Sequence, residues 1–288
     1  IGTVNVKETS QADMAKMMVG REVSFVVEKG EANVGETVLK IENISVKNNK
    51  KVLGLKNFNL EVRKGEIVGV AGVEGNGQSE LVEAITGMRN IEEGKILFNG
   101  KDITKDSIRN RIDEGIAHIP EDRHKRGLIL DYTMEDNMVL KAYKNEPFSK
   151  NGLINREEIK KYSDHIIETF DVRSGEGGKS IARSLSGGNQ QKGIIGREIL
   201  SNPDLLIAVQ PTRGLDVGSI EYIHKRLVEQ RDNGKAVLLV SLELDEVLNV
   251  SDRIAIVNNG ELIGIVNASE TDENEVGLMM AGIKRGES

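Results

Sequence analysis

A glycine-rich stretch at residues 72–79 (GVEGNGQS) carries the strongest signal for chemistry in this sequence. An apolar run precedes it and apolar residues at helical spacing follow it, so a buried strand is expected to turn into a helix here. Glycines in such a turn leave backbone N–H groups uncovered at a helix N-terminus, where phosphate oxygens bind. The spacing matches the phosphate-binding loop G-x-x-x-x-G-K-[ST], except that Gln78 stands at the lysine position. A turn that serves packing alone is the alternative.

A second turn of small residues, at residues 185–192 (LSGGNQQK), is expected to open a helix that runs to about Leu200. The Ser186 hydroxyl, the uncovered N–H groups and the positive helix end all suit an anionic phosphate. An ordinary Ser-Gly helix cap is the alternative. Beside the first turn, this one strengthens the prediction of a phosphate-binding site.

The elements that could position these turns alternate along the chain. Short apolar runs predict buried strands at residues 67–71, 116–120, 205–209, 237–240 and 254–257. Helices are expected after residue 79, at residues 218–233, and in a largely helical insert at residues 133–171. This alternation predicts an α/β fold with a parallel sheet between helices. Residues 37–46, 58–62 and an edge strand at 94–98 predict an antiparallel sheet beside it.

Composition narrows the class of protein. A net charge of -7 and a pI near 5.4 argue against nucleic acid as the main partner. No apolar run approaches the roughly 18 residues of a membrane span. The absence of cysteine leaves no disulfide or thiolate metal site, so the cytosol is the expected compartment. Because the chain begins with Ile and shows no signal segment, we expect a fragment of a longer polypeptide.

The two ends of the chain resemble each other. Residues 1–20 and 263–282 align without gaps and share nine of twenty residues. Composition alone would give about one or two matches. Coincidence is one explanation. The other is that residues 1–36 are the tail of a preceding domain with a linker at 30–35, and residues 37–288 are a second copy of that domain.

In its motifs the chain resembles the nucleotide-binding domains of ABC transporters. Residues 72–79 match the Walker A loop, residues 185–192 the signature motif, and residues 205–212 the Walker B strand and its turn. Ile119-Pro120-Glu121 falls at the Q-loop, Gly214-Leu215-Asp216 at the D-loop, and Ser241-Leu242 at the switch histidine. The resemblance implies a P-loop NTPase (RecA-like) core with an antiparallel β subdomain and a helical subdomain at about residues 128–200.

A narrower resemblance concerns the type of transporter. The stretches PEDR, LSGGNQQK, PTRGLDVG and MMVGRE are similar to those of tandem ATPase subunits of bacterial sugar and nucleoside importers. The combination of EGNGQSEL with AVQPTRGLDVG looks most like the second half of the nucleoside type. This resemblance implies ATP and Mg²⁺, an upstream domain in the same polypeptide, membrane permease subunits, an extracellular substrate-binding protein, and a peripheral place on the cytoplasmic face of the cell membrane. A simple-sugar importer is the alternative, because this subunit does not touch the cargo.

The family's nucleotide-contacting positions can be placed residue by residue. They fall on Gly72, Val73, Glu74, Gly75, Asn76, Gly77, Gln78, Ser79, Glu80, Leu185, Ser186, Gly187, Gly188, Asn189, Gln190 and Asp216. Residues 45–51 contain no aromatic side chain to stack the adenine base. Ser79 is the one Mg²⁺ ligand kept, and we expect it to hold the metal weakly.

Several positions depart from the family in the direction of lost hydrolysis. Gln78 replaces the phosphate-neutralising lysine, Val209 the metal-binding aspartate, Gln210 the catalytic glutamate, Leu242 the switch histidine, and Glu121 the Q-loop glutamine. Losing one such contact typically costs about 3–4 kcal/mol of transition-state stabilisation. No catalytic residue is intact, so we expect this half alone to be hydrolytically inactive.

The signature motif, in contrast, is intact. In ABC proteins a composite site takes its phosphate loop from one domain and its signature from the other, so Ser186 is expected to serve the upstream copy. A structural docking platform without nucleotide binding is an alternative. A soluble ABC-type ATPase acting on nucleic acid is a third, and the acidic charge counts against it. Residues 122–126 are expected to form a solvated loop or to meet the permease.

Overall fold

The computed structural model describes residues 27–285 without a break, together with residues 3, 5, 9, 10, 13, 14, 16, 17, 20 and 22. The first copy of the predicted repeat, residues 1–20, therefore lies mostly outside the described residues. The second copy forms a strand, β12 (Glu261–Asn267), and a helix, α9 (Glu273–Met280), as the repeat pattern predicts. In the described part of the chain, no helix combines the length and the apolar character needed to cross a membrane.

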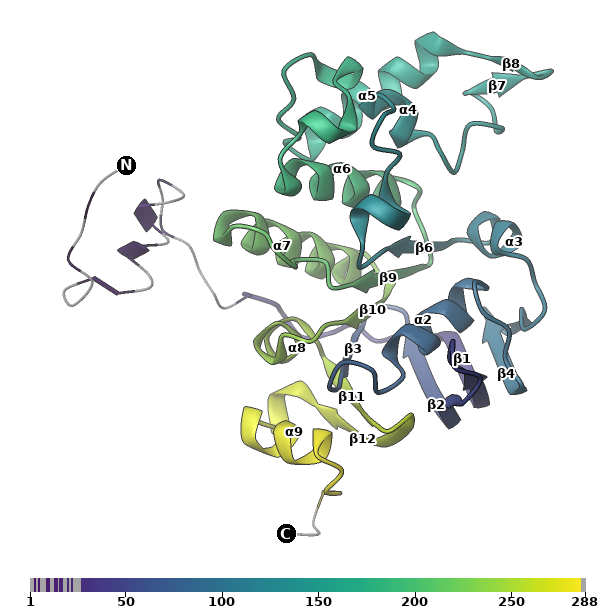
Figure 1. Cartoon of the computed structure of the whole chain (residues 1–288), viewed down its shortest axis with the longest axis vertical. Helices are drawn as coiled ribbons and strands as arrows, with labels where there is room; N and C mark the ends of the chain where they lie inside the picture. The colour runs from purple at the N-terminus through teal and green to yellow at the C-terminus, as the bar shows by residue number, and fades with distance from the viewer. Residues whose placement is uncertain are drawn as a thin grey trace.

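A six-stranded sheet forms the centre of the molecule (Figure 1). Its strand order is β12-β11-β3-β10-β9-β6, with β3 (Ile67–Ala71), β6 (Ile116–Ile119), β9 (Leu205–Val209), β10 (Ala236–Val240) and β11 (Arg253–Asn258). The five strands from β11 to β6 run parallel, and only β12 is antiparallel to its neighbour. All residues of β3, β9 and β10 are buried, which explains their uninterrupted apolar sequences.

A second, antiparallel sheet has the strand order β2-β1-β4-β5. It comprises β1 (Thr37–Lys47), β2 (Leu53–Arg63), β4 (Glu93–Phe98) and the short β5 (Lys101–Asp102). Alternate residues of β2 are buried, including Phe58, Leu60 and Val62, which confirms a half-exposed strand. The prediction of β4 as an edge strand is wrong, because Leu97 and Phe98 pair with β5 on the side away from β1.

Two apolar cores lie on opposite faces of the central sheet. On one face the antiparallel sheet and α2 (Gln78–Thr86) pack together against alternate residues of β3, β9 and β10. On the other face α6 (Gly187–Leu200), α7 (Val217–Asp232) and α8 (Leu244–Val250) cover the remaining residues of these strands. The predicted arrangement of a parallel sheet between helices is therefore confirmed.

A helical region projects from one side of the central sheet, at the top of Figure 1. Its elements are α4 (Met134–Met138), α5 (Arg156–Thr169), the hairpin of β7 (Ser149–Lys150) and β8 (Leu153–Ile154), two single helical turns and α6. A short helix, α3 (Ile108–Asp113), precedes β6. The charged segment after β6 is not a plain loop as predicted, because residues Arg123–Gly127 form a wide helical turn. Asp122 caps that turn by accepting from the backbone N–H groups of His124 and Lys125.

Candidate functional site

The glycine-rich loop turns from β3 into α2 as predicted. Gly75 and Gly77 have φ angles of 89° and 112°, a region that L side chains rarely adopt. A side chain at Gly77 would also collide with the Gly54 carbonyl oxygen, 2.6 Å from an ideal Cβ. No side chain caps the N-terminus of α2. The helix N-terminus is therefore open to an anion, as a phosphate site requires.

The Gln78 side chain folds back into this loop. It is buried, and its Nε2 donates to the Val73 carbonyl oxygen at 3.2 Å. The same Nε2 lies 2.7 Å from where a Cβ on Gly72 would be. A neutral amide thus fills the loop at the position where the family carries a cation, and it ties the loop to itself.

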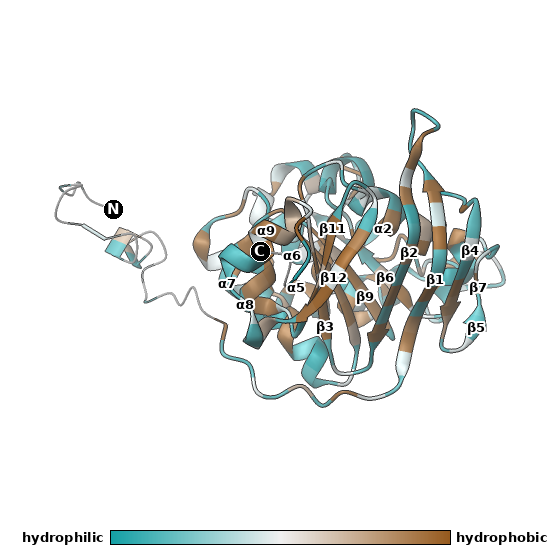
Figure 2. Cartoon of the chain, turned by 90° about the horizontal axis from the view of Figure 1, so that it is seen from below, coloured by the Kyte–Doolittle hydropathy of each residue, from teal (hydrophilic) through white to brown (hydrophobic). Residues whose placement is uncertain are grey.

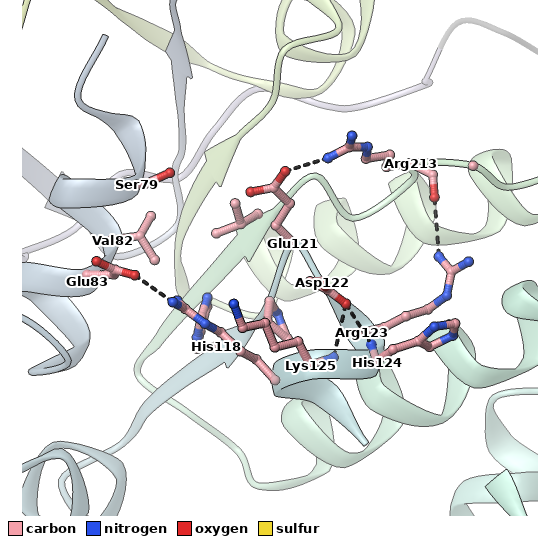
Figure 3. Close-up of a pocket in the computed structure, with 14 residues that line it drawn as sticks. Ser79, Val82, Glu83, His118, Glu121, Asp122, Arg123, His124, Lys125 and Arg213 are labelled. Carbon is pink, nitrogen blue, oxygen red and sulfur yellow. Dashed lines mark hydrogen bonds and ion pairs between the residues drawn. The ribbon is translucent and has the colours of Figure 1, made fainter. Parts of the chain in front are cut away.

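A cavity of about 580 Å³ opens beside the start of α2 (Figure 3). Ser79, Glu121 and Val209 share its wall, so the structure brings together three positions that the sequence separates widely. The Glu121 carboxylate does not stand free, because Arg213 Nη1 donates to it at 2.5 Å. Gln210, Leu242, Ser186 and Asp216 are not among the described residues that line this cavity.

Arginines that the sequence reasoning missed hold the cavity walls in place. Arg126 donates to Glu83 on α2 at 2.7 Å, and Arg123 Nη1 donates to the Arg213 carbonyl oxygen at 3.3 Å. Arg123 belongs to the PEDR motif and Arg126 follows it by three residues, but no local pattern tells which carboxylate or carbonyl group each one meets. The sequence did offer one signal for the ion pair between Glu121 and Arg213: two opposite charges, each next to a motif expected at the nucleotide site.

Val209, Gln210 and Leu242 stand at the family's metal-binding aspartate, catalytic glutamate and switch histidine positions. Val209 ends β9 and presents hydrocarbon to the cavity. Gln210 is buried with a φ of 47°, and its N–H donates to the Val240 carbonyl oxygen at 2.8 Å. Leu242 is 37% exposed. None of the three offers a charged or titratable group to a reaction.

The signature stretch forms the N-terminus of α6. Ser186 is the N-cap residue, and its Oγ accepts from the Asn189 side-chain amide at 2.9 Å. Gly187 follows, and its backbone lies against the Arg123 guanidinium, since a Cβ there would be 2.8 Å from Arg123 Nη2. Ser186 itself is exposed. The corner is therefore an accessible helix start that points at no phosphate-loop residue of its own cavity.

Other signature residues anchor this corner to its surroundings. A Cβ on Gly188 would lie 2.8 Å from the hydroxyl of Ser219 on α7, where Asp216 is the N-cap residue. Gln190 donates to the Ala182 carbonyl oxygen at 2.9 Å, and its Oε1 lies 2.9 Å from His124 Nε2. The corner is thus fixed both to α7 and to the turn after β6.

His118 on β6 also lines the cavity, and its titration is expected to affect stability. Burial, and then the Lys141 ammonium, lower the pKa of His118 from 6.5 to about 4. The unfolded chain therefore binds this proton first, so stability falls as the pH drops from 6.5 towards 4. We expect a loss of up to about 3 kcal/mol over that range, since one pKa unit corresponds to about 1.4 kcal/mol.

Urea unfolding at several pH values checks this expectation. His118→Asn should flatten the decline between pH 6.5 and 4 relative to the unchanged protein. His165→Asn, on the exposed face of α5, is the matched control and should leave the decline as it is. Equal pH dependence in the His118 variant and the unchanged protein would contradict the assignment.

Comparisons with known proteins agree with this geometry. The family model described as ABC transporter matches residues 55–213, more than half of the chain. The chain is 52% identical to the guanosine import ATP-binding protein NupO of Bacillus subtilis over 288 residues, which is all of this chain and 56% of that protein. It is 50% identical to the nucleoside import ATP-binding protein NupA of Lactococcus lactis subsp. cremoris, over 98% of this chain and 56% of that protein. The chain thus spans little more than half the length of these relatives.

A similar solved structure is a nucleotide-free ATP-binding cassette from an ABC transporter. It superposes with a TM-score of 0.72 at 24% identity, over 87% of this chain and all of that one. That likeness concerns the fold. With the family match and the phosphate loop in place, the chain belongs to the ABC transporter family of ATP-binding domains.

Proposed function

We propose that this chain is the second nucleotide-binding half of an ABC importer ATPase for nucleosides, with a degenerate nucleotide site of its own. The names of the relatives at 52% and 50% identity support nucleosides as the cargo class. Their greater length supports an upstream domain in the same polypeptide. Permease subunits, a peripheral place on the cytoplasmic face of the membrane and an extracellular substrate-binding protein complete the proposed assembly.

The residues of the loop fit the phosphate groups of ATP but not a catalytic metal. The open start of α2 and the left-handed glycines offer uncovered N–H groups to an anion. Mg²⁺ needs oxygen ligands, and in this cavity Ser79 offers a hydroxyl while Val209 offers hydrocarbon. The Glu121 carboxylate is already paired with Arg213. The proposal therefore includes nucleotide binding, weak or dependent on the partner domain, and no hydrolytic step at this loop.

The Gln78 geometry is the observation that carries the degenerate site. Phosphoryl transfer depends on charge stabilisation at the transferred group, and the lysine that supplies it is absent. The buried Gln78 side chain donates instead from Nε2 to the Val73 carbonyl oxygen. Each lost electrostatic contact of this kind typically lowers the rate by about 10²–10³.

The signature corner is proposed to complete the ATP site of the upstream domain. Ser186 is exposed at the start of α6, and it lies outside the cavity that contains Ser79. The turn at residues 122–126, which contacts both α2 and α6, is proposed to meet the permease. One hydrolytic site and one degenerate site per pair of domains would follow.

The isolated chain is expected to show no ATP turnover above buffer, which phosphate release measures directly. The reason is that Gln78, Val209 and Gln210 replace the phosphate-neutralising lysine, the metal-binding carboxylate and the general base of the family. Activity that survives a second purification and is lost in Ser79→Ala would overturn the degenerate site. Activity that survives Ser79→Ala as well would identify a contaminating ATPase, and the prediction would stand.

A docking platform that never binds nucleotide is the second candidate, favoured by the way Gln78 fills the loop. Titration with a fluorescent ATP analogue, first with this chain and then with the longer natural protein, separates the two. Saturable binding to this chain that competes with ATP supports the nucleotide site. In the longer protein, two nucleotides bound per polypeptide support that site, and one nucleotide, at the upstream loop, supports the platform. A sugar importer is the alternative cargo class, because relatives at 41% and 38% identity are named for glucose and ribose import. Identifying the ligand of the co-purified binding protein decides between them.

A further inference from the structure

The segment that leads into the domain lies against the protein. Residues 27–36, here called the strap, contain no helix or strand before β1 begins at Thr37. In Figure 2 this segment follows the lower edge of the molecule beneath β3 to reach β1. A Gly-containing stretch between two domains would ordinarily read as a flexible linker. The contacts of the strap indicate otherwise.

A buried arginine reaches the strap from the last turn of α7. Arg231 is 1% exposed, and its Nη2 donates to the Gly30 carbonyl oxygen at 3.0 Å. The same guanidinium pairs with Asp252 at 2.8 Å and with Asp232 at 2.6 Å. The two carboxylates accept from Nε, Nη1 and Nη2, and the strap carbonyl accepts a further bond from Nη2. Because a buried guanidinium is costly when its N–H groups lack acceptors, the strap carbonyl stabilises Arg231.

The first residues of the strap add an apolar and a polar contact. Val27 packs against the core formed by α6, α7 and the central sheet. The Lys29 ammonium donates to the Ser251 carbonyl oxygen just before β11. Burial lowers the pKa of Lys29, and the nearby Asp252 carboxylate opposes that change. The first part of the strap is thus held by the Gly30 backbone carbonyl and by the side chains of Val27 and Lys29.

The second part of the strap pairs with the turn between β2 and β3. Gly35 N donates to the Lys64 carbonyl oxygen at 2.9 Å, and Lys64 N donates to the Glu36 carbonyl oxygen at 2.9 Å. At Gly65, with a φ of 69°, an ideal Cβ would lie 2.1 Å from the Asn33 carbonyl oxygen. The strap therefore runs across the amino-terminal ends of β3 and β11, opposite the end that carries the phosphate loop.

We propose that the surface formed by Arg231, Asp252 and the turn at Lys64–Gly65 is a docking site for the strap, which fixes the direction in which the preceding part of the polypeptide leaves the domain. The occupant is this chain's own residues 27–36, recognised through their backbone groups, the Val27 side chain and the Lys29 ammonium. The chain thereby enters the domain through a docked segment and not through a free linker. This inference goes beyond the nucleotide site and holds whether or not that site binds ATP.

Limited trypsin digestion of the full chain, followed by mass spectrometry, tests the docking. Lys29 and Lys284 are compared in the same sample, since Lys284 is exposed near the other end. Cleavage after Lys29 is expected to be at least about tenfold slower, because a docked segment must detach before a protease can bind it. Equal rates at the two lysines would overturn the proposal.

Variants then assign the protection to the proposed contacts. Arg231→Met should accelerate cleavage after Lys29 about tenfold, with circular dichroism confirming that the domain stays folded. Val27→Ser leaves the arginine network intact and should accelerate it several-fold even if Arg231→Met unfolds. Val34→Ser is the matched control, since Val34 is 40% exposed in the same strap, and it should change nothing. Equal effects of the Val27 and Val34 substitutions would contradict the docked arrangement.

Discussion

In the proposed full-length importer, Ser186→Arg is expected to lower ATP hydrolysis by at least about 100-fold, the loss typical of one phosphate-contacting group. Ser186 is the N-cap of α6, where the positive helix end and the uncovered N–H groups face outward. An arginine there removes the cap, adds a cation at the positive end and fills the space that the opposing phosphate loop would enter. The assay is phosphate release by the proposed longer polypeptide, assembled with the proposed permease subunits in lipid vesicles.

Two further substitutions serve as controls for Ser186→Arg. Gln210→Ala, at the position of the catalytic glutamate, should change the rate less than about twofold, because the proposed degenerate site supplies no hydrolysis. Ser184→Arg changes an exposed serine two residues earlier, whose hydroxyl donates to the Ile181 carbonyl oxygen, and it should also have little effect. The reverse ranking, with Gln210→Ala more damaging than Ser186→Arg, would defeat the proposed division of labour.

Arg111→Met is expected to destabilise the domain by about 3 kcal/mol, since it removes one buried cation and leaves several carbonyl groups unpaired. Arg111 on α3 is 3% exposed. Its Nη1 donates to the carbonyl oxygens of Ala84 and Ile85, both at 2.7 Å, in the last turn of α2. Its remaining N–H groups reach the Thr104 and Asp106 carbonyl oxygens at 3.0 and 3.1 Å.

This guanidinium has no carboxylate partner at hydrogen-bond distance in the described structure, so its charge is balanced by the negative end of α2. Burial lowers the pKa of Arg111, while Asp106 and Glu114 act in the opposite direction. Because α2 carries the phosphate loop at its other end, the same arginine also sets the direction of that loop. Urea unfolding measures the loss. Arg111→Lys should show an intermediate loss, since an ammonium reaches fewer of the carbonyl groups.

Arg109→Met on the same helix is the control, because the Arg109 side chain is 39% exposed, pairs with an exposed Asp113 and donates to a single carbonyl oxygen, that of Lys141 at 2.7 Å. It should cost about 1 kcal/mol, because it removes one surface ion pair and one hydrogen bond to a carbonyl oxygen. A similar loss for both arginines would show that α3 tolerates no apolar substitution at all. The account of Arg111 as the residue that fixes α2 would then be wrong.

Local sequence was sufficient for the elements whose pattern has one physical explanation. Strands β3 and β9 have the predicted bounds, because a run of five apolar residues is too short for a buried helix and suits a strand that is covered on both faces. The helix start at Ser186 follows from its own residue types. The position of β4 in its sheet and the helical turn after β6 were mispredicted. A two-residue partner strand and a capping Asp122 gave too weak a local signal.

What the sequence by itself determined is the chemistry available: a phosphate loop with Gln78 in place of lysine, an intact serine-glycine corner, and no carboxylate at Val209. These are properties of residue types at fixed spacing, and folding does not change them. Only the tertiary structure decided which distant groups meet. Glu121 pairs with Arg213 across 92 positions, and Arg231 reaches the Gly30 carbonyl oxygen across 201. Such pairings depend on strand order and helix packing, because a charged side chain carries no local signal that names its partner.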